Sequence, residues 1–121
     1  MTIEEVRAWF VGHGGGITAG EQLYYERVAG VLDPGETPEL RVMINREGAI
    51  GSALLTDSRL IHIGTNLLKG MQISTVRRSD ITGVELGGLI FGKLTVKHPG
   101  GVMVLDGAKG LAKQLMAALG Y

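Results

Sequence analysis

Apolar and polar residues alternate over most of the chain between residues 39 and 105, which is the pattern of half-buried strands. The strongest example is Leu54–Gly64, where two apolar runs meet at the polar pair Asp57 and Ser58. Short polar side chains of this kind hydrogen-bond neighbouring backbone groups in tight turns. We therefore expect a strand, a turn and a second strand here, with further strands on both sides.

The alternation predicts seven strands in all. They cover approximately residues 39–45, 49–56, 59–64, 71–77, 81–86, 93–98 and 102–105. Proline followed by glycine suits the two central positions of a type II turn. Pro99–Gly100 therefore predicts that the last strand returns antiparallel to the strand before it.

Two short helices are expected before the strands. Thr2 with Glu5 and Thr18 with Glu21 both have the spacing of a capping box, in which the two residues satisfy each other's free backbone donors. Between them, Gly12–Gly16 contains four glycines, which are costly to order in regular structure, so we expect a flexible joint. The second helix should end near residues 33–35, where aspartate, proline and glycine favour a turn.

A third helix closes the chain. Apolar residues recur along one face from Ala108 to Leu119, and Gly120 is placed to end the helix. Asp106 is the expected N-cap. One amphipathic helix cannot cover both faces of seven strands, so the fold class is mainly β (α+β), a strongly bent sheet or partly open antiparallel barrel capped by this helix.

The composition limits the function classes. The 121 residues suit a single domain, which we place at residues 21–121 after an N-terminal helix and joint at residues 1–20. Twelve basic and twelve acidic residues balance, so no overall field favours nucleic acid. With no cysteine, no signal pattern and no apolar run of membrane-spanning length, we expect a soluble cytoplasmic protein.

Three segments, Leu55–Gly64, Ser79–Leu86 and Phe91–Val96, occur together and in this order. In this respect the chain resembles small stand-alone bacterial pleckstrin-homology-like (PH-like) domains, from about Asp33 to Leu119. The resemblance implies a seven-stranded barrel capped by the last helix and used as a binding or assembly module. His62 departs from it, because a large apolar residue is expected there.

Catalytic motifs are incomplete in this chain. Gly87–Leu94 has the glycine and lysine spacing of a phosphate-binding P-loop, but the position of the magnesium-binding Ser or Thr is a leucine, and a strand follows Lys93 instead of a helix. The lipase-like glycines after His13 lack a Gly-x-Ser-x-Gly partner. We therefore expect a protein that is not an enzyme, with no catalytic residues, no cofactor and no metal; a small hydrolase or nucleotide-binding protein is the third-ranked alternative.

The leading hypothesis is an interaction module that binds a protein segment, itself, or both. In the fold that the resemblance implies, an extended segment would add between the fifth strand and the last helix, so the predicted groove residues are Ile81, Gly83, Val84, Leu86, Leu111 and Leu115. The apolar face of the first helix predicts a homo-oligomer held by Ile3, Val6, Trp9 and Phe10. The alternative is weak binding to an anionic lipid or membrane surface, with Arg41, Arg46, Lys69, Arg77 and Arg78 as candidate contacts.

Overall fold

The computed structural model describes all 121 residues, which form two compact units, Met1–Pro38 and Glu39–Tyr121. The first unit contains helices α1 (Ile3–Gly12) and α2 (Ala19–Val31). Both helices begin as expected, because the Thr2 hydroxyl accepts from the Glu5 N–H at 3.2 Å and the Thr18 hydroxyl accepts from the Glu21 N–H at 3.2 Å. The full capping box is confirmed at Thr2, whose N–H donates to Glu5 Oε1 at 2.9 Å.

The glycine segment between the helices is a hydrogen-bonded corner. The Phe10 carbonyl accepts from the N–H groups of His13 at 3.0 Å and Gly15 at 2.7 Å. The Tyr25 hydroxyl donates to the Gly16 carbonyl at 2.7 Å, and the Phe10 and Tyr25 rings stack with centroids 5.2 Å apart. Helix α2 therefore packs with α1 in the first compact unit, which ends at Pro38.

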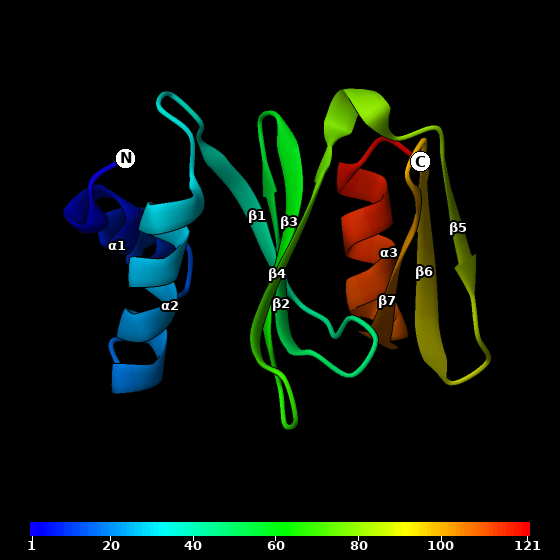
Figure 1. Cartoon of the computed structure of the whole chain (residues 1–121), viewed down its shortest axis with the longest axis horizontal. Coiled ribbons are helices and arrows are strands. Elements are labelled where there is room, and N and C mark those ends of the chain that lie inside the picture. Colours follow the sequence, from blue (N-terminus) through cyan, green and yellow to red (C-terminus); the bar gives the residue numbers. More distant parts are fainter. The chain divides into compact units, whose positions relative to one another are not determined.

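The second unit contains the strands and the last helix. Apart from Pro38, the first residue of β1, it comprises β1 (Pro38–Met43), β2 (Ile50–Thr56), β3 (Arg59–Asn66), β4 (Gly70–Arg77), a 3₁₀ turn (Arg78–Asp80), β5 (Gly83–Gly87), β6 (Phe91–His98), β7 (Gly101–Ala108) and α3 (Lys109–Ala118). The strands form two antiparallel sheets, in the orders β1-β2-β3-β4 and β5-β6-β7, and do not close into a complete barrel (Figure 1). The predicted fold class is confirmed.

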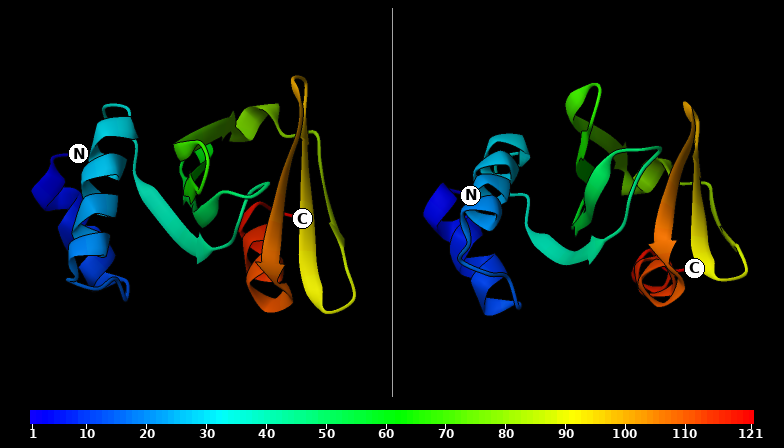
Figure 2. Two further views of the ribbon diagram at one scale, coloured as in Figure 1. Left: turned by 60° about the horizontal axis from the view of Figure 1, so that its bottom comes forward. Right: turned by 90° about the horizontal axis from the view of Figure 1, so that it is seen from below.

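Helix α3 packs on β6 and β7, on the face of the three-stranded sheet that is turned toward the four-stranded sheet (Figure 2). The approach is close, because a Cβ on Gly92 of β6 would lie 2.8 Å from the Ala112 side chain. Apolar side chains of both sheets and of α3 form one core, which comprises Val42, Ile44, Ala53, Leu55, Leu60, Val76, Val84, Leu94, Val96, Met103, Leu105, Ala112 and Leu115. These positions follow the alternation that predicted the strands.

Two local predictions are wrong. Asp106 does not cap α3, because β7 continues to Ala108 and Asp106 pairs with Lys93 inside the sheet. Pro99–Gly100 connects β6 to β7 as expected, but Gly100 lacks the positive φ that a type II turn requires; Gly101 has it, with φ 132°. The antiparallel return of the last strand is nevertheless confirmed.

Candidate binding site

Strand β5, which contains three of the six predicted groove residues, is an edge strand. β5 pairs with β6 along one side, from Gly83–Lys97 to Gly87–Lys93, and no strand pairs with its other side. Helix α3 contacts β5. Of the six predicted groove residues, Val84 and Leu115 are buried in the core, whereas Ile81, Leu86 and Leu111 are half-buried around it. The structure thus brings the predicted strand and helix together, with Val84 and Leu115 in the core between them.

A loop directly after β5 exposes three consecutive large apolar side chains. Leu89 is 96% exposed, Ile90 82% and Phe91 71%. Sequence reasoning interpreted this segment only as a hairpin connection and missed the surface, although three apolar residues between glycines are visible in the sequence. Monomeric domains seldom expose contiguous apolar side chains without a binding role.

A second apolar tip lies at the β3–β4 turn. Leu67 and Leu68 are both 95% exposed, and Lys69 follows them. This turn and the β5–β6 loop both point toward the lower end of the strand unit in Figure 1. The strand unit therefore has two exposed apolar tips.

The five candidate anion contacts do not form one cluster. Lys69 and Arg77 stand at opposite ends of the eight-residue strand β4, roughly 25 Å apart at the rise of a strand. Arg41 donates to the Ser52 hydroxyl at 3.3 Å. Arg78 donates to Glu39 Oε1 at 2.7 Å and to the Thr56 carbonyl at 2.9 Å, which gives it a structural role. Arg46 is separate from these and lines a pocket.

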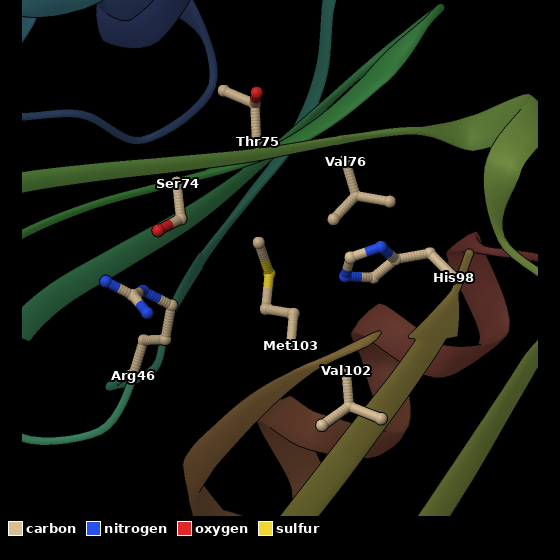
Figure 3. Close-up of a pocket in the computed structure, with 7 residues that line it drawn as sticks. All are labelled: Arg46, Ser74, Thr75, Val76, His98, Val102 and Met103. Atoms are coloured by element: carbon tan, nitrogen blue, oxygen red, sulfur yellow. The ribbon is translucent and has the colours of Figure 1, made fainter. Parts of the chain in front are cut away.

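That pocket lies between β4 and the β6–β7 hairpin. Its walls are Arg46, Ser74, Thr75, Val76, His98, Val102 and Met103, and its volume is about 200 Å³ (Figure 3). Sequence reasoning did not bring these residues together, because they come from the β1–β2 turn, β4, β6 and β7. Of these residues only Arg46 was predicted from the sequence, as a candidate anion contact.

His62 is buried in the strand unit. Cross-strand pairing places it opposite Ala53 and Ser74, and its Nε2 donates to the Ile44 carbonyl at 2.8 Å. Its Nδ1 is buried without a hydrogen-bond partner. Burial lowers the pKa of His62, and the nearby Arg46 lowers it further, against the opposing effects of the Ile44 hydrogen bond and Asp106.

The predicted self-association residues are only partly exposed. Val6 and Phe10 are buried, and Phe10 also meets Tyr24 edge-on with ring centroids 5.3 Å apart. Ile3 and Trp9 are half-buried, and the Trp9 ring stacks on His13 at 3.9 Å. Of the four, Ile3 and Trp9 are therefore the side chains that another copy could still contact.

The segments that resembled catalytic motifs have ordinary structural positions. Lys93 lies in β6 opposite Gly87, which confirms the hairpin interpretation of the P-loop-like segment. His13 follows α1 and its Nδ1 lies 2.6 Å from the Trp9 carbonyl. No group of three or more His, Asp or Glu side chains has the spacing of a metal site, and no helix has both the length and the apolar character needed to cross a membrane.

Comparison with solved structures identifies the fold. The chain is similar to the crystal structure of a pleckstrin homology domain from Shewanella amazonensis SB2B, with 19% sequence identity and a TM-score of 0.57. The match covers 79% of this chain and 93% of that chain. The sequence matches no protein-family model and no curated protein. The strand unit with its C-terminal helix thus has a PH-like fold, as the sequence resemblance implied.

Proposed function

We propose that this protein is a non-enzymatic interaction module that binds an extended protein segment along the free edge of β5. The observation that carries the proposal is the continuity of this unpaired edge with the exposed Leu89–Phe91 loop. A free edge offers backbone hydrogen bonds to an added strand. Exposed apolar side chains beside it add the contact area that a stable complex requires.

The half-buried residues beside the edge give this surface selectivity. Ile81, Leu86 and Leu111 pack against the core but retain some exposure, so they can contact alternate side chains of an added strand. An aromatic anchor is available at Phe91, which begins β6 next to the edge. The partner therefore presents an extended segment with apolar side chains at alternate positions.

Affinity capture from the source cell tests this proposal with three variants. Gly83→Pro removes a backbone donor from β5, and Phe91→Ser removes the aromatic anchor; both should lose a partner that the wild-type protein retains. Leu67→Ser is the control, because it removes an exposed apolar side chain from a different hairpin. Thermal unfolding establishes that each variant is folded. Retention of the same partner by both β5-edge variants would refute the groove.

Self-association is the second part of the proposal. The sheets present unpaired outer edges at β4 and β5, and the half-buried Ile3 and Trp9 offer a helix surface to another copy. Light scattering of the wild-type chain should give a mass above that of a monomer, and Trp9→Ala should lower it. Val11→Ser, on the exposed side of α1, is the control. A monomeric wild-type chain well above micromolar concentration would contradict assembly.

A second candidate function is weak binding to an anionic membrane surface. The exposed tips at Leu67–Leu68 and Leu89–Phe91 point toward the same end of the strand unit, with Lys69 and Lys93 beside them. The Lys109 ammonium also lies at the second tip, where it donates to the Gly88 carbonyl at 3.1 Å. Co-sedimentation with phosphatidylserine vesicles should be weaker at physiological salt than at low salt. It should be lost when Leu67 and Leu68 are both changed to serine. Equal sedimentation with neutral vesicles would exclude this function.

A further inference from the structure

The pocket between the two sheets has the size of a site for one side chain. β4 is an outer strand of the four-stranded sheet and β7 is an outer strand of the three-stranded sheet, so the pocket opens where neither sheet continues. Its volume of about 200 Å³ lies below the roughly 300–1,000 Å³ of pockets that enclose drug-sized ligands. It therefore suits a single group from a larger partner.

The polar side chains that line the pocket are all potential hydrogen-bond donors. Arg46, Ser74 and His98 contribute a guanidinium, a hydroxyl and an imidazole, whereas no carboxylate side chain lines the walls. Figure 3 shows Ser74 directed to the pocket side of β4 and Thr75 directed away from it. The chemistry of the walls is thus complementary to an anion.

Arg46 is largely buried, and its charge is only weakly paired. Its side chain is only 19% exposed, its buried Nε has no hydrogen-bond partner, and its one ion pair, to Glu47, is long at 3.7 Å. A guanidinium presents its N–H groups as a planar fork that matches the two oxygens of a carboxylate. The guanidinium therefore retains donors for a ligand.

The other two donors lie on different walls. Ser74 makes no side-chain hydrogen bond within the chain, and Nδ1 of His98 accepts from the Gly100 N–H at 3.2 Å. Because Nδ1 is used as an acceptor, the neutral ring carries its proton on Nε2. In Figure 3 the ring of His98 extends from its backbone toward Met103, which places this far edge at the pocket.

The remaining walls are apolar. Val76 and Met103 point into the space between the donors, and they suit the methylene groups of an acidic side chain, whereas the Val102 side chain points to the other side of β7. The unpaired edge of β4 runs past the same pocket, where the backbone of a bound segment can pair with it.

We propose that this pocket binds the carboxylate of a glutamate or aspartate in an extended partner segment that adds along the free edge of β4. Arg46 pairs with the carboxylate, Ser74 and His98 donate to it, and the apolar walls enclose its stem. This site lies on a different edge from the β5 groove and does not depend on that groove.

Two blocked peptides test the proposal: acetyl-Thr-Val-Glu-Val-Thr-amide and its counterpart with glutamine in place of glutamate. Amide NMR signals of residues 72–76 and 101–104 and the Arg46 Nε–H signal should move on titration, with a dissociation constant on the order of 1 mM. The glutamate peptide should bind about tenfold more tightly than the glutamine peptide, because it adds charge-assisted hydrogen bonds.

Arg46→Gln should abolish this tenfold preference, whereas Arg77→Gln, which removes the same charge from the exposed end of β4, should retain it. The fold should persist in Arg46→Gln, because the backbone hydrogen bonds between Arg46 and Ala49 do not involve the side chain. Equal binding of both peptides, no movement of these signals, or equal loss in both variants would overturn the proposal. Saturation by inorganic phosphate without binding of the glutamate peptide would also overturn it, in favour of a phosphate ligand.

Discussion

Replacing His62 with leucine should remove an acid-sensitive group from the folded state. His62 is fully buried, with Nε2 bonded to the Ile44 carbonyl at 2.8 Å and Nδ1 without a partner. Burial lowers the pKa of His62 below its ordinary value of 6.5. Below that value the unfolded chain therefore binds a proton that the folded chain excludes. The contribution of neutral His62 to stability is complete above about pH 6.5 and is lost as the pH falls, at up to about 1.4 kcal/mol per pH unit.

At about pH 7.5 the leucine variant should be less stable than the wild type by about 1 kcal/mol, because the Ile44 carbonyl loses its donor while leucine buries more apolar surface. The two stabilities should converge as the pH falls below about 6.5. Urea unfolding followed by circular dichroism, at matched ionic strength, measures the difference. Glu5, whose pKa is lowered by hydrogen bonds with Thr2, loses its contribution only at lower pH and equally in both proteins. Parallel stability curves from about pH 7.5 to pH 5 would refute the reasoning.

Two further substitutions test local features of the strand unit. Glu47→Asn should stabilise the protein by about 0.5–1 kcal/mol. Glu47 has a φ of 45° and Gly48 a φ of 84°, and this left-handed pair of turn positions favours asparagine followed by glycine. A loss of stability in urea unfolding would contradict this explanation of the turn. Arg78→Ala should lower the free energy of unfolding by about 2 kcal/mol, because Arg78 donates to Glu39 and to two backbone carbonyls. Lys97→Ala breaks only the exposed ion pair with Glu85 and should lower it by less than about 0.5 kcal/mol. Equal losses for Arg78→Ala and Lys97→Ala would show that the Arg78 contacts do not stabilise the fold.

The strands could be predicted because their signal is local. The alternation around Asp57 and Ser58 predicted β2, β3 and their turn, and this hairpin is present with Leu55 opposite Leu60. Asp106 shows where local signals fail. Its sequence context suits an N-cap, but pairing with Lys93 across the sheet extends β7 by three residues beyond the predicted end at Leu105.

The pocket could not be predicted, because distant segments assemble it. Arg46 and Ser74 lie on different hairpins of one sheet, and Met103 comes from the other sheet. No spacing in the sequence links these residues; strand register and the angle between the sheets place them together. The exposed Leu89–Phe91 loop differs from the pocket, because its three apolar residues are consecutive in the sequence. Only the structure shows that they lie outside the core.

The glycine segment Gly12–Gly16 is either a flexible joint or a packed turn that holds α1 against α2. A flexible joint would tolerate alanine at Gly15, since alanine stabilises a chain wherever it fits without strain. In the structure a Cβ on Gly15 would contact the Tyr25 hydroxyl and lie 2.7 Å from the Phe10 carbonyl oxygen, which already accepts the Gly15 N–H.

We therefore expect Gly15→Ala to destabilise the helical unit by about 1–3 kcal/mol through overpacking. Gly12→Ala is the control, because a Cβ there meets no atom within 4 Å. The fluorescence of Trp9, the single tryptophan, reports on this unit during urea unfolding. If Gly15→Ala unfolds at the same urea concentration as Gly12→Ala, the segment is a flexible joint, and α1 is free to leave α2 and contact another copy of the chain. A lower urea midpoint for Gly15→Ala, but not for Gly12→Ala, would show that α1 is packed firmly on α2. Assembly would then have to use the exposed parts of Ile3 and Trp9, without exchange of α1 between copies.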